Sequence, residues 1–156
     1  MSKALMSRAM FSTASPFVRY LAAFVVCSIS FSAQAQTFEE TKALAEQGDA
    51  GAQYRLGLEY SIGKSVEKDY DKAFALFHKA ANGGKQEALL AIADAYKNGE
   101  GVIKDDFAAA KWYRKASDLG LAQGHYWLSY YLSKGIGMLE DQEESFRLCK
   151  LAAEQG

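Results

Sequence analysis

The sequence predicts an all-α fold: an α/α right-handed superhelical solenoid of three helix-hairpin repeats with an N-terminal helix. Two observations predict it. Gly48, Gly84, Gly120 and Gly156 are separated by a constant 36 residues, and the positions between them repeat in kind. The only proline, Pro16, precedes all thirteen glycines, so glycine alone interrupts helices in the repeats. A period of this length is typical of stacked two-helix units that present a binding surface.

Residues 1–35 are expected to form a signal peptide that is cleaved. Three basic residues precede the end of an apolar run over residues 20–31, and Ala33-Gln34-Ala35 places small residues where a signal peptidase needs them. The run is about a dozen residues long, too short to span a ~30 Å hydrocarbon core. We therefore expect a mature chain without a membrane span that is periplasmic or secreted. An organellar presequence is the alternative.

Net charge and cysteine content limit the partners. Cleavage would remove three of the 18 Lys and Arg residues and none of the 19 Asp and Glu, which leaves 15 against 19 and a net charge of −4. Such a chain lacks the basic face that a nucleic-acid partner requires. Cys27 lies in the predicted leader, so Cys149 is left alone. We expect Cys149 to be a small buried hydrophobe on the last helix, with an intermolecular thiol as the alternative.

The first predicted element of the mature chain is an N-terminal capping helix at residues 36–47. Thr37 and Glu40 have the spacing of a capping box, and Ala43 and Leu44 supply an apolar face. The segment resembles the end of a repeat, so we expect it to cover the open edge of the first one.

Three repeats follow, at residues 48–83, 84–119 and 120–156, and each begins with a helix. Small or apolar residues recur there at four-residue spacing, which indicates one buried helical stripe. They are Ala52, Leu56 and Tyr60; Ala88, Ile92 and Tyr96; and Gly124, Leu128 and Leu132. A neighbouring position stays small in all copies, at Gly57, Ala93 and Ser129, which predicts close approach of a second helix.

The second helix of each repeat is predicted from its start signal and its alternation of small and large residues. Gly63, Gly99 and Gly135 end the first helices, and Asp69, Asp105 and Asp141 precede the second ones. Asp141 and Glu144 have the spacing of a full capping box. The interlocking residues are Ala73, Leu76, Phe77 and Ala80; Ala109, Trp112, Tyr113 and Ala116; and Ser145, Leu148, Cys149 and Ala152.

The repeated pattern resembles the Sel-one-like repeat (SLR) family, relatives of the tetratricopeptide repeat, over about residues 48–156. The second copy carries the pattern best, with Tyr96, Gly99, Gly101, Val102, Asp105, Ala109, Trp112, Tyr113 and Ala116. Ser65 in the first copy, and Gly124 and Leu132 in the third, depart from it. The resemblance implies a non-catalytic adaptor or regulator that binds a protein or peptide partner in the cell envelope, through a concave side lined by the first helices.

The candidate binding residues lie on the first helices at positions that the repeat pattern leaves free. The third copy has Trp127, Tyr130 and Tyr131 where the other copies have polar, small or aliphatic residues, and Tyr54 and Tyr126 lie nearby. Large aromatic and arginine side chains are typical binding hot spots. The candidates are Tyr54, Arg55, Tyr126, Trp127, Tyr130 and Tyr131. The alternative is that these rings only pack between repeats.

The sequence predicts no catalytic, metal or cofactor site. His78 and His125 have no partner at ligand spacing and are assigned to the surface. We therefore expect no enzyme activity. The alternatives are a β-lactam or cell-wall hydrolase or binder, as in cysteine-rich relatives that pair cysteines in each repeat, and a secreted host-interaction factor.

The apolar edge of the last helix, at Leu148, Leu151 and Ala152, has no following helix in the sequence. Terminal units of a solenoid normally need a solvated outer face. We therefore expect self-association through this C-terminal edge, unless the sequence is part of a longer array.

Overall fold

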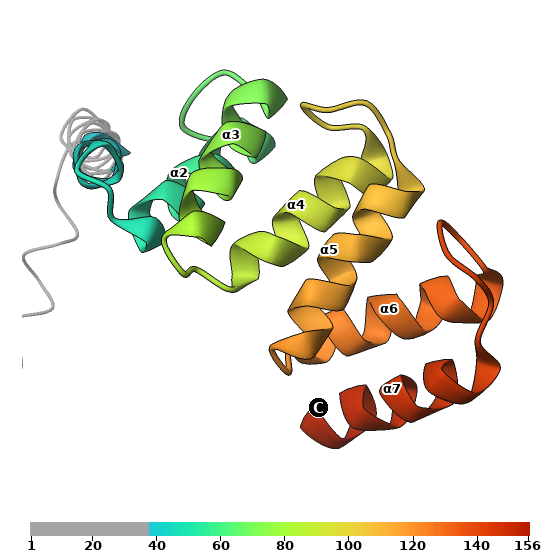
Figure 1. Cartoon of the computed structure of the whole chain (residues 1–156). Helices are drawn as coiled ribbons and strands as arrows, with labels where there is room; N and C mark the ends of the chain where they lie inside the picture. The colour runs from blue at the N-terminus through green and yellow to red at the C-terminus, as the bar shows by residue number, and fades with distance from the viewer. Residues whose placement is uncertain (1–37) are drawn as a thin grey trace, which may run out of the picture. The chain divides into compact units, whose positions relative to one another are not determined.

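Residues 38–156 are helical hairpins joined by short turns in a computed structural model, which describes this part of the chain (Figure 1). The predicted leader and the Thr37 cap lie outside the described residues. Residues 38–46 are helical, and no strand occurs between residues 38 and 156. The helices that follow are α2 (Ala50–Ile62), α3 (Tyr70–Asn82), α4 (Glu87–Asn98), α5 (Asp106–Asp118), α6 (Ala122–Lys134) and α7 (Gln142–Gln155). They confirm the predicted fold class.

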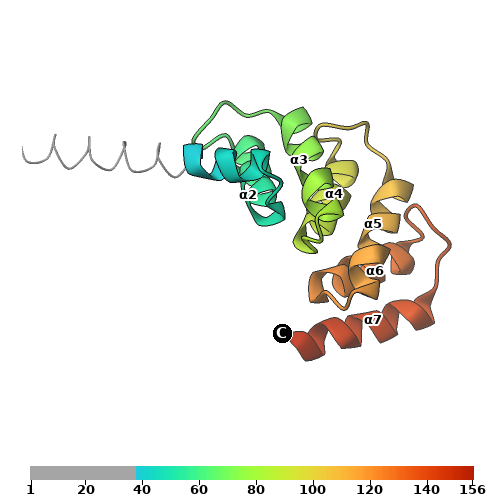
Figure 2. The same cartoon turned by 60° about the vertical axis from the view of Figure 1, so that its left-hand side comes forward.

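The hairpins stack in chain order. Helix α2 pairs with α3, α4 with α5 and α6 with α7, while α3 packs against α4 and α5 against α6 (Figures 1 and 2). Each hairpin therefore completes its core with the helix that follows it. Ahead of α2, the helix at residues 38–46 buries Ala45 against Ala52 and Leu56, with Phe38 at the edge of this cluster.

The buried stripe follows the predicted spacing. Ala88 and Ile92 of α4 have no exposed surface. The small position beside the stripe has the predicted cause, since a Cβ added at Gly57 would lie 2.7 Å from the ring of Phe77 on α3. A side chain there would have to push α3 away, so glycine is retained despite its cost in a helix.

The helix ends also follow the sequence, with one correction. Gly63, Gly99 and Gly135 adopt left-handed φ angles at the ends of α2, α4 and α6. Asp69, Asp105 and Asp141 each accept a backbone N–H at the start of α3, α5 and α7.

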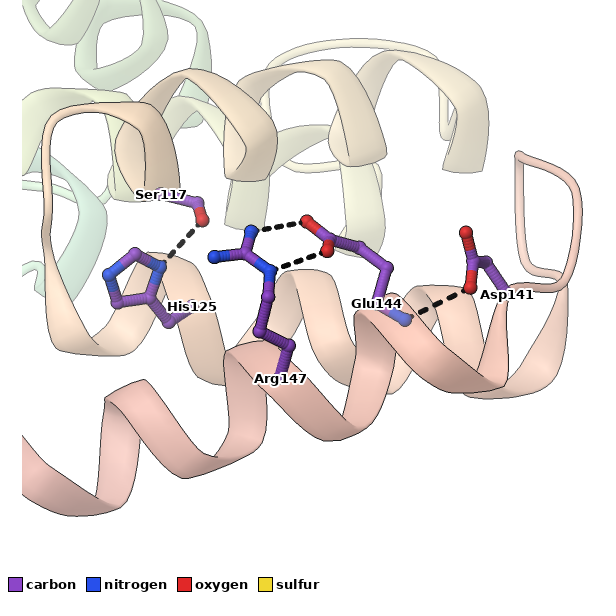
Figure 3. Close-up of polar contacts among 5 residues, drawn as sticks. All are labelled: Ser117, His125, Asp141, Glu144 and Arg147. Carbon is purple, nitrogen blue, oxygen red and sulfur yellow. Dashed lines mark hydrogen bonds and ion pairs between the residues drawn. The ribbon is translucent and has the colours of Figure 1, made fainter.

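The capping box predicted at Asp141 and Glu144 is only half formed. The Glu144 N–H donates to Asp141 Oδ1 at 3.0 Å, but the Glu144 carboxylate does not return to Asp141. It accepts two bonds of 2.6 Å from Arg147, one turn further along α7 (Figure 3). Arg147 holds the pKa of Glu144 below its ordinary value. The Asp141 N–H, which a full capping box would pair with Glu144, donates instead to the Leu132 carbonyl at 3.1 Å.

The loop position at which the first repeat departs from the pattern has a packing explanation. Gly101 has a φ of 71°, and a Cβ there would overlap the backbone carbonyl of Tyr70 at the start of α3. Gly137 meets Asp106 of α5 in the same way. Ser65 holds the equivalent place in the first repeat. The glycines are therefore required where the loop lies against the second helix of the preceding hairpin.

Cys149 corrects the prediction of a small buried hydrophobe, because its thiol is free and exposed. Its counterparts 72 and 36 residues earlier, Phe77 and Tyr113, are 6% and 0% exposed. Those two side chains pack against residues of α4 and α6 respectively. In residues 38–156 no helix follows α7, so the same position stays open there.

Candidate protein-binding surface

Four aromatic residues of α6 form a continuous set of ring contacts, here named the α6 aromatic cluster: Tyr126, Trp127, Tyr130 and Tyr131. Tyr126 meets Trp127 edge to face at 5.3 Å between centroids, and Trp127 meets Tyr130 in the same way at 6.1 Å. Tyr130 contacts Tyr131 at 6.2 Å. Edge-to-face pairs of this kind restrain ring orientation. The structure therefore brings together four of the six predicted binding residues.

The inner half of the cluster serves packing between hairpins. Tyr131 is 2% exposed and lies 5.3 Å from the fully buried ring of Tyr113 on α5. Trp127, which is half-buried, stacks on the same ring at 5.7 Å. The packing alternative therefore describes Tyr131, and it describes one face of Trp127.

An ion pair from α4 fixes these inner rings. The Tyr113 hydroxyl donates to Asp94 Oδ1 at 2.6 Å, and Lys97 Nζ lies 2.6 Å from the same oxygen. Lys97 Nζ also lies 4.0 Å from the centroid of the Trp127 ring, a close cation–π contact. Burial, followed by the bond to Asp94, raises the pKa of Tyr113, and burial raises the pKa of Tyr131 to about 12. Both hydroxyls thus stay protonated at neutral pH.

Sequence reasoning did not select Asp94 and Lys97 as site residues. Their signal was present: an acidic and a basic residue stand three positions apart on one helix, where the third repeat has Tyr130 and Ser133. That spacing places both side chains on the same side of α4, where they contact Tyr113 and Trp127.

The outer half of the cluster is open. Tyr126 is 54% exposed and Tyr130 is 44% exposed. Both rings contact Trp127, which is itself held by Tyr113 and Lys97. Rings that are both exposed and held in place lose little conformational freedom on binding, which is the property of a good contact residue.

Tyr54 and Arg55 lie on α2 and are held by other partners. Tyr54 packs against Phe77 at 5.8 Å and beneath Lys85 Nζ, also at 5.8 Å. Burial and the charge of Glu87 raise the pKa of Tyr54. Arg55 is exposed. In residues 38–156, no ring contact joins Tyr54 to the α6 aromatic cluster, so the six predicted residues form two groups.

The sequence predicts a surface position for His125, but the side chain is only 7% exposed. Its Nδ1 lies 2.7 Å from Ser117 Oγ across the α5–α6 turn (Figure 3). Ser117 is 5% exposed, so its hydroxyl is not presented to a substrate, unlike a serine nucleophile that a histidine activates. The contact joins two helices, and we assign it a packing role.

The surface position predicted for His78 is also wrong. It is half-buried between the rings of Phe74, at 4.6 Å, and Trp112, at 5.3 Å. Burial, and then the positive charge of Lys115, lower the pKa of His78. The sequence pattern aligned His78 with Arg114 and Lys150, which hid the aromatic neighbours that α5 supplies.

Within residues 38–156, no cluster of three or more His, Cys, Asp or Glu side chains has a geometry suited to a metal ion. No helix in this part of the chain combines the length and the apolar character needed to cross a bilayer.

Solved structures of other proteins have the same architecture. A protective antigen of uropathogenic Escherichia coli with an SLR fold is 39% identical, with a TM-score of 0.74 over 76% of this chain and 26% of the antigen. A Sel1 repeat protein from Oxalobacter formigenes is 30% identical, with a TM-score of 0.74 over 78% of this chain and 49% of that protein. Cysteine-rich protein B of Helicobacter pylori, at 23% identity and a TM-score of 0.61, shares the fold.

Longer proteins with curated functions match as well. The chitin synthase regulator SKT5 of Malassezia restricta is 30% identical over 114 residues, which are 71% of this chain and 8% of the regulator. HRD3B of Arabidopsis thaliana, a component of an ERAD-associated E3 ubiquitin-protein ligase, is 32% identical over 108 residues, 68% of this chain and 17% of HRD3B. The chain thus spans less than a fifth of the length of either relative.

The Sel1 repeat matches three successive segments, at residues 50–85, 86–121 and 122–156. Each segment contains one helix hairpin of the stack. With three matched repeats, the chain belongs to the Sel1 repeat family.

Proposed function

We propose that this chain is a non-catalytic protein-interaction module whose α6 aromatic cluster contacts a protein or peptide partner. One observation carries the proposal: Tyr126 and Tyr130 are about half exposed, yet both are held against Trp127. The repeat pattern does not need rings there, because the middle hairpin has Leu90 and Asp94 at these positions. Tyrosines presented in this way are typical of binding hot spots.

The relatives support a role in binding. Two of them are described as a regulator of chitin synthase and as a component of a ubiquitin-ligase complex. Both descriptions fit a repeat that brings proteins together, and the SLR resemblance has the same implication. Fold-level similarity does not identify this chain's partner, so the site must be tested directly.

The test compares capture of partner proteins by the wild-type chain and by the double variant Tyr126→Ser/Tyr130→Ser. Phe107→Ser is the matched control, since Phe107 of α5 is 55% exposed and lies outside the cluster. A protein captured by wild type and by the control should be lost with the double variant. Titration of that protein should then show affinity weakened by about tenfold or more, as expected for a hot spot. Equal affinity for all three chains would contradict the proposed site.

We further propose that the chain acts in the cell envelope, in the periplasm or after secretion. The predicted signal peptide supports this location, and so does the similarity to a protective antigen of uropathogenic Escherichia coli. Cell fractionation with amino-terminal sequencing should recover a mature chain that begins at Gln36 outside the cytoplasm. A full-length cytoplasmic product would contradict the location and leave the binding site untouched.

The β-lactam alternative comes from cysteine-rich relatives. Cysteine-rich protein B of Helicobacter pylori is similar to this chain in fold alone. Cys149 is the one cysteine of residues 38–156, so the cysteine pairs of those relatives cannot form in this part of the chain. Turnover of nitrocefin by the purified chain would overturn the non-catalytic proposal.

The open face of α7 supports the proposal of self-association. Phe146 is 75% exposed, whereas its counterpart in the second repeat, Ala110, is 0% exposed. Cys149 is exposed as well, although its own counterparts Phe77 and Tyr113 are buried. Leu148 itself is 2% exposed, so the edge expected at Leu148, Leu151 and Ala152 is displaced toward Phe146. Sedimentation should show a concentration-dependent dimer that Phe146→Glu abolishes and Phe107→Glu leaves intact. A monomer at all concentrations would reject this contact.

A further inference from the structure

A hollow of about 420 Å³ lies where the turn between α3 and α4 meets the end of α5. None of its lining residues belongs to the α6 aromatic cluster. Its lining combines aliphatic residues with charged ones at the rim: Ala81, Gly84, Lys85, Gln86, Leu89, Lys115, Asp118 and Leu119. Pockets of this size with a few polar groups are typical of small-ligand sites.

The position of this hollow follows from sequence differences at the three junctions of residues 38–156, where a junction is the contact between the first helix of a repeat and the helix before it. At the first junction Gln53 Nε2 donates to the Ala45 carbonyl, eight residues earlier, at 3.1 Å. At the third junction His125 Nδ1 meets Ser117 Oγ, also eight residues earlier, at 2.7 Å. These polar contacts join each first helix to the helix before it.

The middle junction has no such contact. Leu89 occupies the position of Gln53 and His125, and Ala81 lies eight residues before it. Neither side chain can make a hydrogen bond, and both line the hollow. The place that a polar bridge fills in the outer junctions is therefore an aliphatic depression in the middle one.

The rim offers one cation free to bind an anion. Lys85 already pairs with Glu87, with 2.8 Å between Nζ and Oε1. Lys115 Nζ lies 3.8 Å from the centroid of the Trp112 ring, and no carboxylate in residues 38–156 lies within ion-pair distance of it. The ring orients the ammonium group without neutralising it. A ligand carboxylate would supply the missing counter-charge.

Asp118 completes the set of recognition groups. An ionised carboxylate only accepts hydrogen bonds, so it favours a ligand donor such as an amide N–H. The lining thus has an aliphatic floor at Leu89, a cation at Lys115 and an acceptor at Asp118.

We propose that this hollow binds a small amphipathic carboxylate with an aliphatic body and an amide N–H, such as an N-acylated aliphatic amino acid. The aliphatic group packs on Ala81, Leu89 and Leu119, and the carboxylate pairs with Lys115. The amide N–H donates to Asp118.

N-acetyl-leucine is the probe, and N-acetyl-leucinamide, which lacks the carboxylate charge, is its matched analogue. Titration of the isotope-labelled chain, followed by NMR, should show saturable shifts confined to amides near residues 81–89 and 115–119. The amide analogue should bind at least about fivefold more weakly, since it cannot pair with the Lys115 ammonium. Absence of saturable shifts, or shifts spread over all hairpins, would overturn the proposal.

Two lysines of α5 provide a matched pair of variants. Lys115→Gln should weaken binding of N-acetyl-leucine to the affinity of the amide analogue. Lys111→Gln should have no effect, although Lys111 also lies over a ring, 4.3 Å from the centroid of Phe107. Equal losses from both variants would mean that only overall charge matters, and this would reject the site.

Leu89→Gln tests the aliphatic floor by placing the residue of the first junction in the middle one. It should abolish binding of both probes. Amide chemical shifts elsewhere in the chain that match those of the wild type would show that the variant folds. Unchanged binding in a folded Leu89→Gln chain would contradict the proposal as directly as a failed titration of the wild type.

Discussion

Helices α5 and α7 carry equivalent positions of the same repeat, but their outer faces meet different surroundings. On α5, Tyr113 is fully buried against α6, where it contacts Trp127 and Tyr131 and bonds to Asp94 of α4. On α7, the equivalent Cys149 is exposed. The helix sequence alone therefore does not determine burial, because the following hairpin supplies the second wall of each core.

The largest expected effect is the loss of the Tyr113 ring. Tyr113→Ala should destabilise the chain by about 3–5 kcal/mol, because it empties a closed core at the contact between two hairpins. Cys149→Ala, at the same position of the open face, should change the free energy of unfolding by less than about 0.5 kcal/mol. Urea unfolding monitored by circular dichroism measures both. Similar losses of unfolding free energy in the two variants would contradict the proposed difference between the buried face of α5 and the open face of α7.

A smaller effect is expected at Asp94. Asp94→Ala removes the acceptor of the Tyr113 hydroxyl and the partner of Lys97, and should cost about 1.5 kcal/mol. The same urea titration measures it, with Glu154→Ala on α7 as the control. Glu154 is exposed and its carboxylate lies 3.9 Å from Lys150 Nζ, so its loss should be near zero. An unchanged free energy of unfolding in Asp94→Ala would show that the ring packing alone holds α4, α5 and α6 together.

The smallest expected effect concerns pH and the position shared by His78 and Lys150. His78 is enclosed by rings of α3 and α5, and burial lowers its pKa below the ordinary 6.5. Between the folded pKa and 6.5 the unfolded chain binds more protons, so His78 reduces stability as the pH falls through this range. NMR titration should give a pKa below 6.5 for His78. The fall in stability from pH 7 to pH 5.5 should be smaller in His78→Asn.

Charge neutralisation at Lys115 refines this prediction. Lys115→Gln should move the pKa of His78 upward, because the nearby ammonium disfavours the imidazolium form. Lys150→Gln on the open face should not move it. A His78 pKa at or above 6.5 in the wild type would show that the rings leave the imidazole solvated.

The fold could be predicted from the sequence because its determinants are local and repeat three times. The small residue at Gly57 and the aspartate caps depend on contacts within one hairpin, and the stripe at Ala88 and Ile92 follows the period of the helix. The prediction of a full capping box was wrong because the Asp141 N–H donates to the Leu132 carbonyl and the Glu144 carboxylate pairs with Arg147. The choice of these partners depends on three-dimensional geometry, which residue spacing does not contain.

The candidate site could be predicted only in part, because it depends on contacts between hairpins. Repeat alignment selected the aromatic residues of α6 but could not divide exposed Tyr126 and Tyr130 from buried Tyr131. That division is set by Tyr113 of the preceding hairpin. His125 was misplaced for the same reason, since Ser117 lies eight residues earlier and a 36-residue alignment does not compare the two.

Thiol accessibility tests most directly whether each hairpin completes its core with its neighbour. Ala45 and Ala153 are three repeat lengths of 36 residues apart and hold the same position in the repeat. Ala45 is 6% exposed, whereas Ala153 is exposed. Each would be changed to cysteine in a chain with Cys27→Ser and Cys149→Ser, and reaction with an aromatic disulfide reagent would be timed. The Ala153→Cys thiol should react as fast as in the unfolded chain, and the Ala45→Cys thiol about 100-fold more slowly, because it waits for local opening. Equal rates at the two positions would contradict the account.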